Sequence, residues 1–490
     1  MTSLSQALSL FDDAKLQRFS KKCNTFDELS VKKHSILDLN QALCAKTTDI
    51  NTFIVNCEWL LRFLFVPLWL IMRVLIVNTS ERTGGAAVAA NRLMEALNNN
   101  GVKAKMLVRD KDTTNLSVCA LPQNWKLRWH FLWERLCIWL HLHLKREHLF
   151  EIDIANCGTD ITNLPEFKEA DIIHLHWINQ GMLSLKGIRK ILQSGKPVVW
   201  TMHDIWPATA ICHLTMGCRH FEVQCQNCPL LPGGGSNNDL SARIWKQKQQ
   251  MLEGKRVSIV TCSQWLGSEA QRSALLNKQD ITTIPNSIDT NRYRPSDKKK
   301  ARQSLGLQLD GHIILFASQR VTNPNKGMQY LIDACKLMAS EHPDCCNKTS
   351  VAILGGHAEE IAHLLPFPTH ALGYVNDEQR IVNVYNAADV FVLPSLSENL
   401  PNTIMEAMAC GVPSVGFRVG GIPEMIDHLS NGYVANYRDA ADLAKGIHYV
   451  LDEADQQTMS NNCLQKVAHN YSQQSVAKRY IELYESLKNK

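Results

Sequence analysis

Two glutamates, Glu398 and Glu406, stand eight positions apart in the stretch SENLPNTIMEAMACGVPSVGF (397–417). An apolar run at 388–395 precedes them and is typical of a short strand that is buried on both faces. Pro401 and Gly411 mark the two ends of a helix that is expected over 402–409. Glu398 is therefore expected in the loop at the carboxyl end of a strand, and Glu406 two turns along the helix that follows.

This arrangement suits the binding of a phosphate ester that carries hydroxyl groups on both sides. In open parallel sheets, ligands bind beyond the carboxyl ends of the strands, and a helix N-terminus there offers unpaired backbone N–H groups to an anion. Two acceptor carboxylates beside such a cradle suit a nucleoside diphosphate sugar. The alternative is that the two glutamates lie on a solvated helix face.

Composition and charge limit the class of protein. The chain has 490 residues, 45% hydrophobic and 20% charged, which predicts two or three folded domains rather than a disordered chain. The net charge of +5 suits an anionic ligand or a membrane surface. A nucleic-acid partner is not expected, because we find no zinc-finger helix, aromatic RNA-binding strand or dense basic stripe.

From residue 72 onward, apolar strand-like runs alternate with helical stretches, which predicts an α/β fold of two Rossmann-like, doubly wound domains that face one another across a cleft. The first unit has a strand at 74–77, a loop with paired glycines at 84 and 85, and a helix at 86–97; it lacks the GxGxxG spacing of a dinucleotide site. We expect the N-terminal domain over 72–287, the C-terminal domain over 288–470, and a last helix over 471–490.

Residues 1–71 are expected to form a leader or extension ahead of the first domain. The run FIVNCEWLLRFLFVPLWLI (53–71) is apolar over a membrane-spanning length. Glu58 and Arg62 disfavour a span, because each costs about 2.5–3.5 kcal/mol at the centre of a bilayer. The run also lies too far along the chain for a signal peptide. A spanning helix, an interfacial helix and a poorly ordered leader all stay open.

Four of the 16 cysteines cluster in CHLTMGCRHFEVQCQNCP, at Cys212, Cys218, Cys225 and Cys228. No secretion signal is recognised, so a reducing compartment is expected, and thiolates on a metal are favoured over disulfides. The spacing predicts a closed Cys₄ site for a structural zinc, which would brace a loop on the acceptor side. An iron–sulfur or redox site and four free cysteines are the alternatives.

The segment KLRWHFLWERLCIWLHLHLKREHLF (126–150) is rich in tryptophan, leucine and basic residues. It has two interpretations, a core helix hairpin of the first domain or an interfacial surface that docks on the inner leaflet of a membrane. The protein is accordingly expected in the cytoplasm, and in the second case at the inner face of the membrane.

Five motifs follow one another along the chain: a GG loop, an HD pair after a strand, IPNxID, an arginine followed by KG, and ExxxxxxxE. In this order the chain resembles the family-4 retaining glycosyltransferases of the two-Rossmann, GT-B type over 72–490. Each motif is weak alone, but their joint order is strong. Within the family the likeness is to the bacterial transferases that build exopolysaccharide, capsule or O-antigen units. It also implies that the helix at 471–490 returns to the first domain.

The resemblance implies a site for a nucleotide diphosphate sugar donor in the second domain. Arg320 and Lys326 would pair with the diphosphate, because the leaving group gains negative charge as the glycosidic bond breaks. Glu406 would accept hydrogen bonds from the ribose hydroxyls. For the two cations the alternative is ordinary surface charge.

The sugar end of the donor is implied to lie at Glu398. This carboxylate, with the backbone amides of Asn399 and Leu400, would hold the sugar hydroxyls and stabilise positive charge at the anomeric carbon. Gly85 would approach the donor from the first domain, and His203 would hydrogen-bond the transferred sugar, unless it is a buried structural histidine. The family often has glycine where this chain has Asn399, which leaves the identity of the sugar open.

The implied reaction is transfer, with retention of anomeric configuration, to a glycan or polyprenyl-linked acceptor in cell-surface polysaccharide synthesis. The acceptor hydroxyl would attack on the leaving-group face, and a donor phosphate oxygen would take its proton. No catalytic metal is expected, and the DKD string at 110–112 is ascribed to chance. Two other functions stay open, a nucleotide-sugar epimerase of the same architecture and a non-catalytic, zinc-bearing interaction protein.

Overall fold

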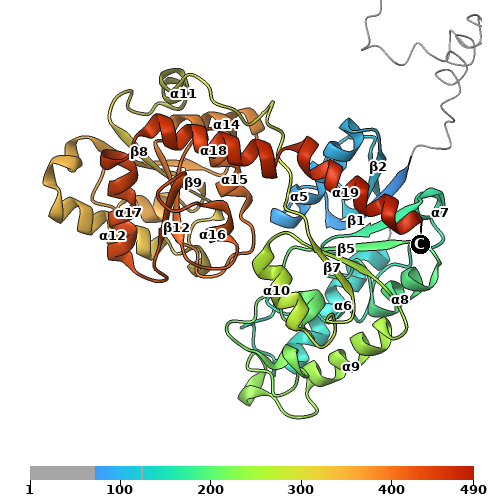
Figure 1. Ribbon diagram of the computed structural model, residues 1–490. Coiled ribbons are helices and arrows are strands. Elements are labelled where there is room, and N and C mark those ends of the chain that lie inside the picture. Colours follow the sequence, from blue (N-terminus) through green and yellow to red (C-terminus); the bar gives the residue numbers. More distant parts are fainter. Residues whose placement is uncertain (1–71, 123–124, 490) are drawn as a thin grey trace, which may run out of the picture. The chain divides into compact units, whose positions relative to one another are not determined.

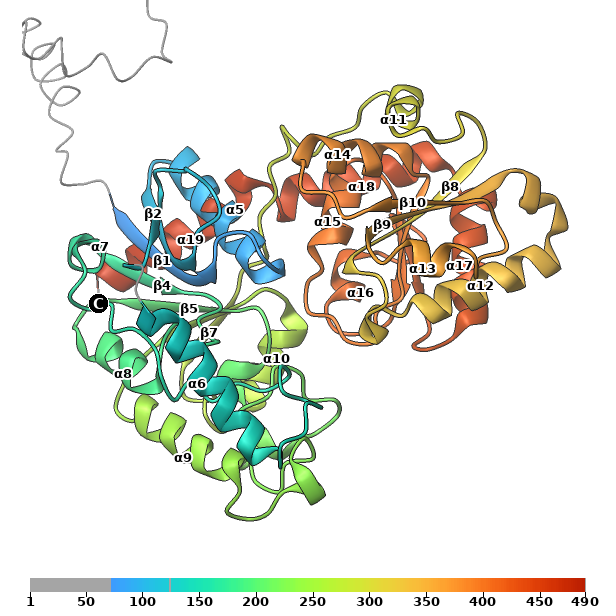
Figure 2. The same ribbon diagram turned by 180° about the vertical axis from the view of Figure 1, so that it is seen from behind.

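The computed structural model describes residues 72–122 and 125–489, so the interpretations of residues 1–71 lie outside the described part. The described chain forms two parallel β-sheets with helices packed against them (Figures 1 and 2). Every strand pairing within the two sheets is parallel. The predicted fold class, α/β with two Rossmann-like units, is confirmed.

The first sheet has the strand order β3-β2-β1-β4-β5-β6-β7. Its strands are β1 (Arg73–Ser80), β2 (Lys103–Asp110), β3 (Val118–Ala120), β4 (Ile172–Leu175), β5 (Val198–Met202), β6 (Ser258–Thr261) and β7 (Asp280–Thr283). Its helices are α5 (Gly85–Asn99), α6 (Trp125–His141), α7 (Pro165–Glu169), α8 (Leu185–Gln193), α9 (Leu240–Leu252) and α10 (Gln264–Arg272). The order reverses between β1 and β4, and ligands of such sheets bind at the carboxyl ends beside a reversal.

The second sheet has the order β10-β9-β8-β11-β12-β13 and reverses between β8 and β11. Its strands are β8 (His312–Arg320), β9 (Thr349–Gly356), β10 (Thr369–Gly373), β11 (Val390–Leu393), β12 (Ser414–Phe417) and β13 (Gly432–Ala435). The helices that follow β7 along the chain are α11 (Lys298–Leu305), α12 (Met328–Glu341), α13 (Glu359–Ala362), α14 (Glu378–Ala387), α15 (Asn402–Ala409), α16 (Ile422–Met425), α17 (Ala440–His448), α18 (Gln456–Asn470) and α19 (Gln473–Lys488).

The last helix, α19, lies against the first sheet rather than the second. In Figure 1 it is the red helix beside α5 and β1, which are blue. Val476, Ala477, Tyr480 and Tyr484 are buried there in one apolar cluster with residues of α5 and of the first sheet. The helix therefore ties the last described segment of the chain to α5 and the first sheet.

The segment 126–150 contains one long helix, α6, rather than a hairpin, and Leu127 and Ile138 on this helix are buried in the core of the first domain. The side chains of α6 that pack inward include the charged pair Glu134 and Arg135, and both are buried. Glu134 accepts hydrogen bonds from the backbone N–H groups of Ile154 and Ala155, at 3.0 and 2.6 Å. The inner face of the helix thus combines buried apolar and charged side chains, and a second apolar stripe on the opposite face is exposed, which is Trp125, Trp129, Leu132, Trp133, Leu136 and Leu140.

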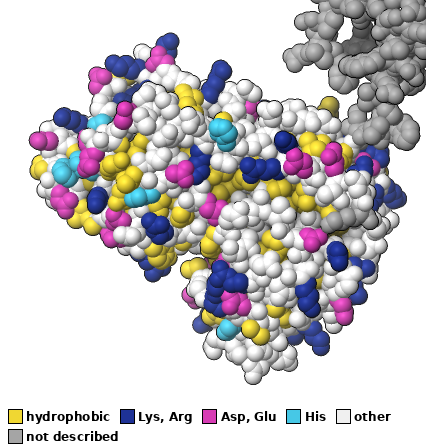
Figure 3. Space-filling model, in the orientation of Figure 1, with side chains coloured by type: hydrophobic (Ala, Val, Ile, Leu, Met, Phe, Trp, Pro, Cys, Tyr) yellow, Lys and Arg dark blue, Asp and Glu magenta, His cyan; other side chains and the backbone are white. Residues whose placement is uncertain are grey.

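Elsewhere the surface carries mixed charge. On the face seen in Figure 3, lysine and arginine side chains are interspersed with aspartate and glutamate rather than gathered in a stripe. Among the described helices, none combines the length and the apolar character that a membrane span requires.

Candidate functional site

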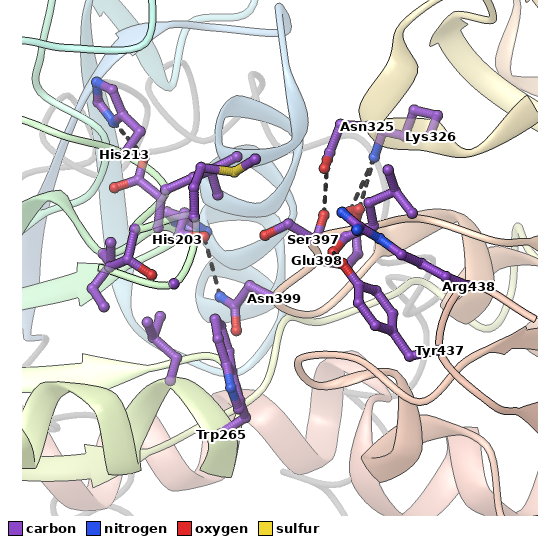
Figure 4. Close-up of a pocket in the computed structure, with 18 residues that line it drawn as sticks. His203, His213, Trp265, Asn325, Lys326, Ser397, Glu398, Asn399, Tyr437 and Arg438 are labelled. Carbon is purple, nitrogen blue, oxygen red and sulfur yellow. Dashed lines mark hydrogen bonds and ion pairs between the residues drawn. The ribbon is translucent and has the colours of Figure 1, made fainter. Parts of the chain in front are cut away.

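A cavity of about 530 Å³ is lined by residues that follow β5, β8 and β11, so both sheets contribute to it (Figure 4). Lys326, Glu398 and Asn399, which the sequence singled out, meet here with His203. In Figure 4, Lys326 and Arg438 lie on one side of Glu398, and His203 lies on the other. We call this space the Glu398 cavity.

Lys326 and Glu398 form an ion pair inside the Glu398 cavity. The Lys326 ammonium lies 2.9 and 3.1 Å from the two carboxylate oxygens, and both side chains are largely buried. The turn that carries the lysine depends on Gly327, which has a φ of 71° and whose added Cβ would lie 1.8 Å from the carbonyl oxygen of Pro394. The backbone after β8 thus packs closely against the end of β11, and this contact brings cation and carboxylate together.

A pair of glycines supports the Glu398 loop from behind. A Cβ on Gly420 would lie 1.6 Å from the Glu398 carbonyl oxygen, and a Cβ on Gly421 would lie 2.2 Å from the Asn399 carbonyl oxygen. The Gly421 N–H donates to that same Asn399 oxygen at 2.9 Å. The loop is therefore fixed by backbone contacts, which leaves the Glu398 side chain for the cavity.

Asn399, where the family often has glycine, uses its side chain to join the two sheets' loops. Its amide nitrogen donates to the His203 carbonyl oxygen at 3.1 Å, and its amide oxygen accepts from the Ser263 hydroxyl at 2.5 Å. A glycine could make neither bond. The side chain is thus committed to the first domain's loops, and Leu400 beside it is buried.

His203 lines the cavity, but both its ring nitrogens face protein groups. Nε2 lies 2.9 Å from Nδ1 of His176, and Nδ1 lies 3.7 Å from the Cys262 sulfur. Burial lowers the pKa of His203 to about 4, so the ring is neutral at pH 7. His174 is fully buried and is bonded to Thr201 and Tyr484, each at 2.7 Å, so its role is structural.

His213 is a cation in the wall of the Glu398 cavity. Its ring nitrogens lie 2.8 Å from an oxygen of Asp204 and 2.6 Å from an oxygen of Asp153. Burial alone would lower the pKa of His213, but the two carboxylates outweigh it and raise the pKa to about 10. A charged carboxylate–imidazolium–carboxylate chain therefore runs from the cavity into the core of the first domain.

We expect the destabilisation caused by His213→Gln to depend on pH. An unfolded histidine has a pKa near 6.5, so the stability contributed by the charged His213 is complete below about pH 6.5 and is lost as the pH rises towards 10. The difference in unfolding free energy between wild type and variant should therefore be largest at pH 6 and shrink by pH 10. Chemical denaturation at pH 6, 8 and 10 measures it.

The unfolding free energy of the variant must be subtracted from that of wild type at each pH. A buried lysine titrates over the same pH range, and its effect on stability has the opposite sign. Burial lowers the pKa of Lys248 to about 7, so its contribution to stability improves as the pH rises from 7 towards the ordinary lysine value near 10.4. The variant retains Lys248, and subtraction removes this effect. A constant difference between wild type and His213→Gln at all three pH values would contradict a charged His213.

Glu406 lies outside the Glu398 cavity. It lines a separate cavity of about 610 Å³, together with Arg92 and Thr83 of the first domain and Tyr374 of the second. The two glutamates thus face different spaces at opposite ends of the segment 398–406. We call this second space the Glu406 cavity.

A third cavity, of about 640 Å³, adjoins both of the others and contains Gly85. It shares His203 with the Glu398 cavity and Thr83 with the Glu406 cavity. The side-chain amide of Asn402, at the start of α15, donates to the Gly85 carbonyl oxygen at 3.1 Å. The N-termini of α5 and α15 therefore meet between the two glutamates.

Neither of these two helix N-termini has a side-chain cap. Gly84 precedes α5 and Pro401 precedes α15, and neither supplies a capping hydrogen bond. Uncapped N-termini leave backbone N–H groups available to an anion. Arg320, which was expected at the diphosphate, is exposed at the end of β8 and donates to the Thr322 hydroxyl at 3.1 Å, outside all three cavities.

The expected zinc site is not supported. Within residues 72–122 and 125–489, no group of three or more histidine, cysteine, aspartate or glutamate side chains is arranged to hold a metal ion. Cys212 and Cys218 are half-buried. The spacing of the cysteines resembles a zinc motif, but their arrangement does not provide the ligands.

The cysteine segment nevertheless reaches the site. His213 directly follows Cys212, and the residues from Leu214 to Gly217 line the Glu398 cavity. The sequence alone did not identify His213 as a site residue. It did single out the HD pair at 203–204, and Asp204 of this pair is the partner of His213. Nothing local to Arg438 or Trp265 indicates that they line this cavity.

Two family models match the chain. Residues 83–292 match the model described as Glycosyltransferase Family 4, and residues 311–453 match the model described as Glycosyl transferases group 1. Together the two matches span more than half of the chain, and they fall on the first and the second sheet respectively.

Similar sequences carry related names. D-inositol 3-phosphate glycosyltransferase 2 of Catenulispora acidiphila is 32% identical over 35% of this chain and 42% of its own length. The D-inositol 3-phosphate glycosyltransferase of Saccharomonospora viridis is 24% identical over 64% of this chain and 69% of its own. The chain thus spans less than half the length of the first of these relatives.

Solved structures share the fold at low identity. Sucrose-phosphate synthase of Thermosynechococcus elongatus aligns with a TM-score of 0.59 at 19% identity, covering 85% of this chain and 99% of its own. HepE of Anabaena, solved in complex with UDP and glucose, aligns with a TM-score of 0.55 at 18% identity, covering 85% and 100%.

Proposed function

The chain belongs to the glycosyltransferases that these two family models describe, and we propose that it moves a sugar, with retention, from a nucleoside diphosphate sugar to a glycan or polyprenyl-linked acceptor. The observation that carries the proposal is the division of Glu398 and Glu406 between two cavities, with uncapped helix N-termini between them. A donor of this class has hydroxyl groups at both ends and two phosphates in the middle.

The proposed donor lies along this line of cavities. Its ribose hydroxyls donate to Glu406, its diphosphate meets the N-termini of α5 and α15 near Gly85, and its sugar lies beside Glu398. Lys326, paired with Glu398, is close enough to the sugar end to offset charge on the departing diphosphate. Arg320 needs a change of side-chain conformation to join it. His203 contributes to the sugar pocket through its position in the wall and through its bond to Asn399.

The experiment that tests the function is titration calorimetry with a panel of nucleotide sugars, followed by product analysis. We expect one sugar nucleotide to bind best and its sugar to appear on an acceptor with unchanged anomeric configuration. UDP-sugars belong in the panel, since the Anabaena neighbour was solved with UDP. An epimerised sugar nucleotide formed without acceptor would favour the epimerase instead. A chain that binds no sugar nucleotide would contradict both enzymes.

The acceptor is proposed to be membrane-linked, as in the synthesis of cell-surface polysaccharide. The support is the exposed stripe on α6, which includes Trp125, Trp129 and Trp133 at 71%, 51% and 42% exposure. Amphipathic helices that present tryptophan and leucine beside basic residues lie in the membrane interface. Inositol phosphate, the acceptor that the names of the two relatives suggest, is the soluble alternative and belongs in the acceptor assay.

The charge beside the stripe favours an anionic bilayer as the occupant of this face. Lys126, Arg128, Lys145 and Arg146 are exposed, whereas of the two acidic residues of the segment 126–150 Glu134 is buried and only Glu147 is exposed. Each basic residue near an anionic surface contributes about 1 kcal/mol. The proposed location is therefore the cytoplasm, at the inner face of the membrane.

We expect the full chain to sediment with phosphatidylglycerol vesicles and much less with phosphatidylcholine vesicles. Leu132→Ser with Leu140→Ser should weaken this binding several-fold by removing apolar contact with the lipid, and added salt should weaken it too. The matched control is Leu309→Ser with Leu364→Ser, which changes two exposed leucines of the second domain. Equal binding of both double variants, or a concentration-dependent dimer in place of vesicle binding, would contradict the membrane as the partner.

A further inference from the structure

Arg92 is a buried arginine of the first domain that reaches the second. It lies on α5, and its Nη2 is 2.7 Å from a carboxylate oxygen of Glu406 on α15. Arg92 and Glu406 are each only 8% exposed. An arginine that is buried this deeply is normally paired and hydrogen-bonded through all of its nitrogens.

The surroundings of Arg92 fix the guanidinium in place. Its central carbon lies 5.0 Å from the centre of the Tyr293 ring, which is within range of a cation–π contact. The second oxygen of Glu406 accepts from the Tyr385 hydroxyl at 2.7 Å, so the carboxylate is held from both sides. Neither Arg92 nor Glu406 can turn away without breaking a buried hydrogen bond.

One nitrogen of Arg92 has no partner. Nη1 is buried and makes no hydrogen bond to any described residue. A buried donor without an acceptor is unfavourable, and a ligand that brings an acceptor relieves it. Arg92 also lines the Glu406 cavity, so an acceptor that enters this cavity approaches the same guanidinium group.

We propose that Arg92 is a further residue of the donor site, supplied by the first domain: it positions the Glu406 carboxylate for the ribose, and its Nη1 donates to a ribose oxygen. This inference rests on the proposed function and names a residue for the nucleoside end of the same site. Arginine suits the task because its planar fork presents two nitrogens in fixed directions, one for each partner. Lysine has a single nitrogen and can satisfy one of them at a time.

The proposal makes ribose recognition depend on Arg92. The first step is calorimetry of wild type with UDP, GDP and ADP, and the tightest binder is then compared with its 2′,3′-dideoxy counterpart. Arg92→Met should weaken the ribonucleoside diphosphate at least tenfold and the dideoxy compound less than threefold. Arg92→Lys should keep the fold and give an intermediate loss confined to the ribonucleoside diphosphate. Arg272→Met makes the same change on α10, outside the three cavities, and should bind like wild type.

The outcomes separate the two levels of the argument. If wild type binds none of the three diphosphates, the proposed function fails, and this inference with it. If wild type binds one of them and both Arg92 variants lose affinity equally for the ribose and dideoxy forms, Arg92 is only structural and the inference is overturned. Unchanged affinity in Arg92→Lys and Arg92→Met overturns it as well. Melting temperatures of each variant show whether a loss of binding comes from unfolding.

Discussion

Lys326→Ala is expected to lower turnover by about two to three orders of magnitude, the cost of removing one group that stabilises developing charge. The lysine ammonium lies 2.9 Å from Glu398, at the proposed sugar end of the donor and therefore near the bond that breaks, where its charge offsets the charge that the departing diphosphate gains. Because that charge is greater in the transition state than in the bound donor, kcat should fall more than donor affinity. Steady-state kinetics and calorimetry on the same preparation separate these two quantities.

The control for this variant is Lys336→Ala, which removes an exposed lysine from α12 in the same domain. It should keep wild-type turnover. Since Lys326→Ala also leaves the Glu398 carboxylate without its cation, the melting temperature must be measured. Wild-type turnover in a folded Lys326→Ala protein would remove this lysine from the site.

Glu398→Gln is expected to lower turnover, whereas Glu406→Gln is expected to weaken donor binding. Glu398 lies at the sugar end, where its charge stabilises an anomeric carbon that becomes positive in the transition state. Its replacement should lower kcat by about a hundredfold with little change in donor affinity, since the interaction is stronger in the transition state than in the ground state.

Glu406→Gln should instead weaken donor binding. A hydrogen bond to a charged group contributes roughly 1.5–3 kcal/mol, which is about 10- to 100-fold in the dissociation constant. Donor dissociation constants have to be measured apart from turnover, because a Michaelis constant combines the two. If both substitutions change both quantities alike, the two glutamates do not divide the donor between its ends.

The fold and the helix of the opening stretch were predictable because local signals mark them. Pro401 and Gly411 bracket α15, which begins at Asn402 and ends at Ala409 as the sequence predicted. The apolar run before it forms β11, whose residues are all buried. The periodicity of a strand or a helix depends on residues that are close together in the chain, so a single sequence is enough to predict these elements.

The site itself was only partly predictable, because its contacts join residues that are far apart in the chain. Arg92 and Glu406 are separated by 314 positions, and Asn399 and His203 by 196. The sequence identified Glu406, Asn399 and His203 as site residues, but not Arg92. No pattern among neighbouring residues indicates that the members of either pair are in contact. These long-range contacts determine which cavity each glutamate faces, so the sequence alone does not predict it.

Two further patterns had the right spacing but an ambiguous meaning. An apolar stripe on a helix has the same periodicity whether it faces a core or the surface. The sequence of α6 has apolar residues on two faces, and only the structure shows which face is buried, with Ile138 beside Glu134 and Arg135. Cysteine spacing shows that four thiols can be brought near one another. It does not fix their directions, and the ligand geometry of a metal depends on those.

The return of α19 to the first sheet has a consequence for synthesis on the ribosome. About 190 residues separate the end of β7 from the start of α19, yet Tyr480 and Tyr484 fill the same apolar cluster as β1. At about 5–20 residues per second, roughly 10–40 seconds pass between the two. During that interval the nascent first domain exposes the apolar surface that α19 will cover, and premature association between growing chains is most favourable there.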